Sequence, residues 1–192
     1  MVGGVGCITP QETEICPAVG VGELVVTEVR GDQSGILGQY VEIYSASASA
    51  IELRGLHVVV RGPRKPAVPD EPDARMIVGR IVVRRALTIA PGDRVVLAGL
   101  PPTSAPPEID YAWQPDFLAS GDAKNLPAAD GEVELEACGV VIDHVAWTAL
   151  PEPGTYSLGL ATPDAAANDA AAAWCTNATI TGTPGESNPT CP

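Results

Sequence analysis

Short β-branched runs, each closed by glycine or proline, are the feature that most limits what this chain can fold into. The runs are 22–31, 39–47, 51–61, 76–89, 94–100, 131–147 and 155–163. The 192 residues include 20 glycines and 19 prolines, a density typical of a chain with many turns. Because helices do not alternate with these runs, the pattern predicts an all-β sandwich rather than βαβ units.

Alternation within 39–47 predicts how one strand lies. Val41 and Ile43 alternate with polar or aromatic residues, so we expect one buried face and one exposed face that carries Tyr40 and Glu42.

Two later segments predict other elements. The segment 131–147 indicates a hairpin that turns at Cys138-Gly139. The segment 162–174 is the one helical candidate, of a turn or two, with Thr162 as cap and Pro163 at the first helical position.

We interpret 22–192 as one domain with long loop insertions, and 1–21 as an N-terminal leader or linker. Gly4-Val5-Gly6-Cys7 is similar to the lipobox that precedes a lipidated cysteine, although leucine is absent at its usual place. Cys7 is therefore a candidate lipidation site, and an incidental cysteine in a flexible N-terminus is the equal alternative.

Acidic residues dominate the charge, which is −13 with a pI near 4.4. A field of this sign opposes nucleic-acid binding. No apolar run is long enough to span a bilayer, so we expect membrane contact only through a lipid anchor. We interpret the clustered basic residues as charges that protect strand edges: Arg61, Arg64, Lys65, Arg75, Arg80, Arg84 and Arg85.

The order of several segments resembles that of bacterial lamin-tail domains. Six segments between about Gly22 and Asn188 occur in that family's order. They are GELVVTEV, QYVEIYSAS, IELRGLHVV, LTIAPGDRVVLA, GEVELEACGVVIDHVAW and the terminal GTPGESN. Tyr40, Ser45 and His57 depart from the family pattern. The resemblance implies an immunoglobulin-like β-sandwich of lamin-tail type, used as a secreted or surface module.

Five cysteines without a C-x-x-C motif indicate disulfides rather than a metal site. Beyond Cys7, the remaining four allow three connectivities. We favour Cys16–Cys191, which would tie both flanking segments to the sandwich, with Cys138–Cys175 as the second pair.

The longest irregular segment, 101–131, is the candidate binding loop. Tyr111, Trp113 and Phe117 are the candidate partner or ligand surface, and folding of the loop back onto the sandwich is the alternative. Calcium could take oxygen ligands from such a loop, but without a recognised spacing we favour solvated charge for its acids: Asp110, Asp116, Asp122 and Asp130. We expect no metal site and no cofactor.

Catalysis is not expected. Asp143 and His144 are adjacent on a strand and point to opposite faces, so Asp143 cannot orient His144 towards Ser157 as a triad requires. No G-x-S-x-G elbow is present, and His57 lies elsewhere. We expect Asp143 to accept hydrogen bonds from backbone amides.

These patterns predict a non-enzymatic module, secreted or attached to the cell envelope (periplasm or outer membrane), for protein–protein interaction or surface scaffolding. Its partners would be proteins of the envelope or extracellular space. The alternative is an accessory domain that binds glycan or Ca²⁺ through 101–131.

Overall fold

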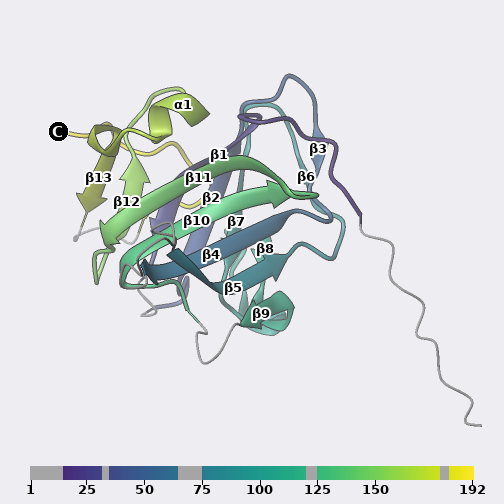
Figure 1. Cartoon of the computed structure of the whole chain (residues 1–192), viewed down its shortest axis with the longest axis horizontal. Coiled ribbons are helices and arrows are strands. Elements are labelled where there is room, and N and C mark those ends of the chain that lie inside the picture. Colours follow the sequence, from purple (N-terminus) through teal and green to yellow (C-terminus); the bar gives the residue numbers. More distant parts are fainter. Residues whose placement is uncertain (1–14, 32–34, 65–74, 120–124, 178–181) are drawn as a thin grey trace, which may run out of the picture.

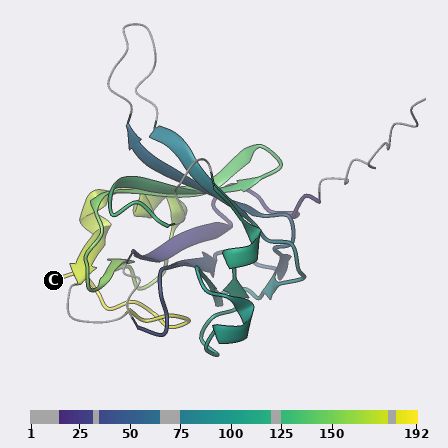
Figure 2. The same cartoon turned by 90° about the horizontal axis from the view of Figure 1, so that it is seen from below.

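The chain folds as an all-β sandwich, which confirms the predicted class. The computed structural model describes residues 15–31, 35–64, 75–119, 125–177 and 182–192. Two sheets lie face to face as layers (Figures 1 and 2), in the strand orders β13-β12-β1-β2-β7-β8 and β11-β10-β4-β5-β9. A small third sheet pairs β3 with β6.

The strands are short, as the spacing of turn residues predicts. In chain order they are β1 (Leu24–Arg30), β2 (Tyr40–Ser45), β3 (Ile51–Glu52), β4 (His57–Arg64), β5 (Arg75–Val82), β6 (Thr88–Ile89), β7 (Arg94–Ala98), β8 (Tyr111–Ala112), β9 (Phe117–Ala119), β10 (Ala129–Ala137), β11 (Val140–Ala149), β12 (Thr155–Leu158) and β13 (Trp174–Asn177). The helical elements are α1 (Ala165–Asn168) and the 3₁₀ turns η1 (Pro102–Ser104), η2 (Gln114–Asp116) and η3 (Ala171–Ala173).

Aliphatic side chains from both sheets form the core. Val41 and Ile43 of β2 share one buried cluster with Val58 and Val60 of β4 and Leu135 of β10. All five side chains are fully buried, so each removes its apolar surface from water. This burial holds the two sheets together.

The hairpin predicted at 131–147 is confirmed as β10 and β11. Its two-residue turn places Cys138 at φ 46° and Gly139 at φ 78°, the left-handed pair that suits the twist of a hairpin. A bulge shifts the register beyond Leu135, where Ile142 is the extra residue on β11.

The expectation that β2 exposes one face is wrong. Tyr40 and Glu42 are as fully buried as Val41 and Ile43. The C-terminal segment 182–188, which we call the strap, lies over this second face, and the Gly185 amide donates to the Glu42 carboxylate. Alternation along β2 could not show that a distant segment covers its polar side.

The helical candidate has the expected length, one α-helical turn followed by the 3₁₀ turn η3, but a different cap. Asp164, not Thr162, is the N-cap of α1, and its carboxylate accepts hydrogen bonds from the amides of Ala166 and Ala167. Pro163 therefore precedes the cap instead of opening the helix. Aspartate is the stronger N-cap residue of the two, which accounts for the shift.

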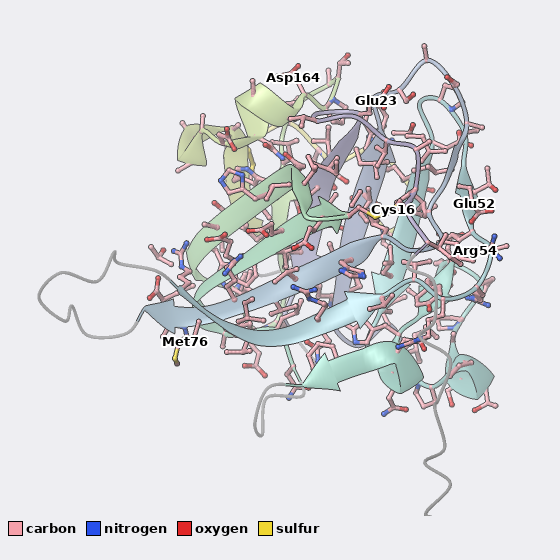
Figure 3. The ribbon with its side chains drawn as sticks, turned by 45° about the vertical axis from the view of Figure 1, so that its right-hand side comes forward. Cys16, Glu23, Glu52, Arg54, Met76 and Asp164 are labelled. Carbon is pink, nitrogen blue, oxygen red and sulfur yellow. A yellow bond between two sulfur atoms is a disulfide. The ribbon has the colours of Figure 1, made fainter. Side chains whose placement is uncertain are left out.

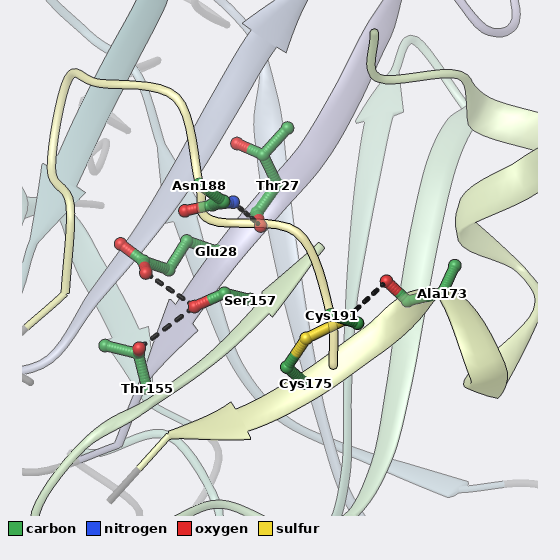
Figure 4. The surroundings of a disulfide bond; sticks show 8 residues. All are labelled: Thr27, Glu28, Thr155, Ser157, Ala173, Cys175, Asn188 and Cys191. Carbon is green, nitrogen blue, oxygen red and sulfur yellow. Dashed lines mark hydrogen bonds between the residues drawn. A yellow bond between two sulfur atoms is a disulfide. The ribbon is translucent and has the colours of Figure 1, made fainter. Parts of the chain in front are cut away.

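The predicted disulfide pairing is also wrong, although all four cysteines are bonded. Cys16 joins Cys138 with a Cα–Cα distance of 5.6 Å, and Cys175 joins Cys191 at 5.5 Å. The N-terminal segment runs beside the β10–β11 turn, where the Gly22 amide donates to the Ile142 carbonyl. The N-terminal segment is thus bonded to the β10–β11 turn, and the C-terminal segment to β13 (Figure 3 labels Cys16; Figure 4 shows the second bond).

Candidate functional site

The predicted aromatic loop surface is not formed, because two of its three rings are buried. Tyr111 and Trp113 are 1% and 2% exposed. β8, which begins at Tyr111, pairs in parallel with β7 and carries the loop back onto the sandwich. The Tyr111 hydroxyl accepts the Arg84 amide at 2.9 Å. Phe117 is half-buried against Gly79. This is the packed alternative, and the prediction of an exposed Trp113 is wrong.

The acids of the 101–131 loop do not gather into one site. Asp110 accepts the Val96 amide at 2.8 Å, and Asp116 lies 3.2 Å from the Arg84 guanidinium. Asp130 pairs with Arg75. Among the residues that the structure describes, no group of three or more His, Cys, Asp or Glu side chains could hold a metal ion. Asp122 and Cys7 lie outside those residues.

The residues weighed for catalysis are held apart in separate contacts. Asp143 accepts hydrogen bonds from the Val26 amide at 2.7 Å and the Asn168 carboxamide at 2.8 Å, so its predicted bonding to backbone is confirmed. Burial raises the pKa of Asp143 to about 6, and those hydrogen bonds act in the opposite direction.

His144 faces Asp169 at 3.7 Å, away from Asp143. The Ser157 hydroxyl donates to Glu28 at 2.6 Å. His57 lies 3.7 Å from Glu136. These side chains therefore do not form a nucleophile–base pair.

Two buried glutamates, Glu28 of β1 and Glu42 of β2, form the most unusual polar group of the molecule. Neither has any exposed surface. Glu28 accepts from the Ser157 hydroxyl at 2.6 Å, the Tyr40 hydroxyl at 2.5 Å and the Thr183 amide at 3.1 Å. Burial, and next the charge of Glu28, raise the pKa of Tyr40 above its ordinary range. The Tyr40 phenol therefore remains a hydrogen-bond donor to Glu28.

Glu42 is held by donors from three elements. The Thr27 hydroxyl donates at 2.6 Å, the Gly185 amide at 2.8 Å, and the Arg94 guanidinium lies 3.3 Å away. Burial raises the pKa of Glu42 to about 7, against the lowering effect of the Thr27 hydrogen bond.

The strap closes this group with its backbone. Besides the amides of Thr183 and Gly185, the Asn188 carboxamide donates to the Thr27 carbonyl at 2.8 Å (Figure 4). Gly182 has φ 103°, and a Cβ there would collide with the Tyr40 hydroxyl. The glycine- and proline-rich chain end is therefore ordered by two buried carboxylates as well as by the Cys175–Cys191 bond.

A cavity of about 90 Å³ opens between β11, β12, β13 and the α1 turn. Tyr156 and Trp174 stack there with ring centroids 4.7 Å apart and planes 13° apart, and His144 and Asp169 stand on another side. Trp174 belongs to the core cluster, and sequence reasoning missed the cavity beside it. No sequence signal marks it, because its walls come from five separate elements, η3 included.

Basic residues on the five-stranded sheet are paired across strands. Arg61 lies 3.1 Å from Glu134, and Arg75 lies 2.7 Å from Glu132. Arg80 lies 3.7 Å from Glu136. Arg61, Arg75 and Arg80 are therefore held in cross-strand ion pairs. Lys65 and the Arg64 side chain lie outside the described part of the chain.

Exposed aliphatic side chains surround the Cys16–Cys138 bond. Val140 and Val141 at the hairpin tip are 52% and 43% exposed. Ile15 and Val21, on the adjoining N-terminal segment, are 47% and 72% exposed. We call these four residues the hairpin-tip surface.

Comparison with known proteins gave no match among family descriptions, curated proteins or solved structures. No helix in the described ranges is long and apolar enough to cross a membrane. The lamin-tail resemblance stays a prediction.

Proposed function

We propose that this chain is a non-enzymatic module that acts in an oxidising compartment, secreted or attached to the cell envelope, and binds protein partners. The observation that carries the proposal is the pair of disulfides, which fasten both end segments onto one sandwich. Structural disulfides persist outside the reducing cytosol, and two of them are compatible with that location. Lipidation at Cys7 would supply the attachment to the envelope.

The hairpin-tip surface supports the binding part of the proposal. Ile15, Val21, Val140 and Val141 are four of the seven large apolar side chains that stay exposed among the described residues. The other three are Ile36, Met76 and Ile77. Exposed apolar residues that gather in one place mark interaction sites more often than singly scattered ones. The nearby disulfide fixes the two segments that carry them, which lowers the entropy lost on binding.

The polar groups support a role without catalysis. Glu28 and Glu42 are closed from solvent by the strap, and the charged side chains of β4, β5 and β10 pair with one another. The order of strands and the terminal GTPGESN, which forms the strap, favour the lamin-tail resemblance and its surface role.

Photo-crosslinking in intact cells tests this function. The full-length chain would carry a photoreactive amino acid at Val141, with a matched variant at exposed Thr103 in η1. We expect a discrete protein adduct from Val141 and none from Thr103. On intact cells, a membrane-impermeant thiol reagent should label the four bonded cysteines of this protein only after reduction. The same adducts from both positions would contradict the proposal. So would labelling of the four bonded cysteines without reduction.

A further inference from the structure

β11 is an edge strand of the five-stranded sheet, and within the described residues no strand pairs with its outer edge. The Cys138-Gly139 turn and the bulge at Ile142 set the register, which turns the backbone groups of His144, Ala146 and Thr148 away from β10. The Ile142 carbonyl already accepts from Gly22. The outward groups of Ala146 and Thr148 have no partner within the described parts of the chain.

This open edge lacks the features that usually protect one. Natural edges carry charged residues, proline or a covering element, because unpaired strand groups recruit other chains. The segment 145–149 reads Val-Ala-Trp-Thr-Ala, with neither charge nor proline. Ala146 and Thr148 are exposed, whereas Val145 and Trp147 point into the core. An added strand would thus meet free backbone groups and no steric barrier from large side chains.

The cavity lies directly beside this edge. Val145 and Ala146 line it together with Tyr156 of β12 and Trp174 of β13 (Figure 1 shows these strands beside β11, with α1 above). Residues of a strand alternate between the two faces of its sheet. Every second side chain of a strand added to β11 would therefore point towards the cavity.

The chemistry of the cavity favours a cationic side chain. The Tyr156–Trp174 stack offers an aromatic wall for an alkyl stem or a cation, and the Asp169 carboxylate, 52% exposed, stands near its rim. The whole chain carries a net charge of −13, which attracts a basic segment and opposes pairing with a second copy of this chain.

We propose that β11 binds an extended, basic segment of a partner protein by strand addition at Ala146 and Thr148, with one lysine or arginine side chain in the Tyr156–Trp174–Asp169 cavity. This inference rests on the proposed function, because it extends the binding surface for a protein partner from Val140 and Val141 along β11 to Ala146 and Thr148. Main-chain hydrogen bonds would give affinity and the cavity would give selectivity, as in other complexes formed by strand addition.

Titration of the ¹⁵N-labelled full chain with a short peptide of alternating valine and lysine tests the docking mode. A peptide of the same charge with proline at its central valine cannot pair as a strand and serves as the control probe. We expect amide shifts at Ala146 and Thr148 and a shift of the Trp174 indole. The proline peptide should bind at least about tenfold more weakly.

Two variants make the test specific. Ala146→Pro removes only an outward N–H, which an edge strand tolerates, and should abolish the shifts. Asp169→Asn should weaken binding several-fold more than Asp93→Asn, which removes the same charge at an exposed turn remote from the cavity.

The inference would be overturned if the amide shifts mapped elsewhere or if both peptides bound equally well. It would also be overturned if Asp169→Asn and Asp93→Asn weakened binding equally, or if Ala146→Pro left binding unchanged. A wild-type dimer that Ala146→Pro converts to a monomer would also overturn it, because the strand added to β11 would then come from a second copy of this chain. Peptide binding is measured on purified protein, so its failure is distinct from a failure of the cellular test at Val141.

Discussion

The stability of this protein should fall as the pH rises from 5 to 8, because two buried carboxyl groups hold protons in the folded state. The pKa of Glu42 rises from 4.5 to about 7, and that of Asp143 from 3.8 to about 6, in both cases chiefly through burial. An unfolded chain releases these protons near pH 4, whereas the folded chain keeps them to higher pH. Between these limits the native state binds more protons, so the free energy of unfolding declines as the pH rises.

The size of the fall follows from the same values. Integrating proton binding from pH 5 to 8 gives a loss of roughly 2 kcal/mol for Glu42 and roughly 1 kcal/mol for Asp143. Each side chain is at most 5% exposed, so solvent screening reduces these figures little. The Arg94 guanidinium, 3.3 Å from Glu42, limits the rise in the Glu42 pKa and is already included in it.

Urea unfolding of the oxidised protein at pH 5 and pH 8 measures the effect. Glu42→Gln cannot ionise, so its stability should fall by roughly 2 kcal/mol less than that of the wild type over this range. Glu186→Gln removes the same charge from an exposed position of the strap and should leave the wild-type fall intact. A wild-type stability that is constant or rises between pH 5 and 8 would refute the reasoning. So would a Glu42→Gln variant that keeps the full fall.

Three further outcomes follow from the strap and the loop. Gly182→Ala should destabilise by about 2 kcal/mol or more in thermal unfolding, because its Cβ would collide with the Tyr40 hydroxyl at a positive φ. Replacing Cys175 and Cys191 by serine should remove about 3 kcal/mol, since the bond closes a loop of sequence separation 16, and should speed amide exchange in the strap. Unchanged exchange there would contradict this role. Trp113→Ala should lose about 3–5 kcal/mol of stability, as expected for a side chain 2% exposed, and an unaffected melting temperature would show that the ring is not in the core.

Strand positions and the sandwich could be predicted because they depend on local patterns. The β-branched runs of β1 and β2 and the Cys138-Gly139 turn carry their signals within a few residues. The strap could not be predicted from the alternation of β2. Its amides reach Glu28 and Glu42 from more than a hundred residues away in the sequence, so no local pattern records the contact.

The errors in the candidate site have the same origin. Disulfide pairing depends on which segments meet in space. The sequence alone therefore showed which partners Cys16 could have, but not which of them it bonds. Trp113 lies in a loop rich in proline, which suggested exposure, yet parallel pairing of β8 with β7 carries the ring into the core. The cavity at Trp174 depends on five elements that meet only in the folded chain.

Peptide mapping without reduction, on protein isolated from its own cells under thiol-blocking conditions, tests the central claim most directly. The account predicts two linked peptide pairs, one joining Cys16 to Cys138 and the other Cys175 to Cys191. These bonds would show both that the end segments are fastened as described and that the protein matures in an oxidising compartment. Four blocked, unlinked cysteines, or Cys16 linked to Cys191, would contradict the account.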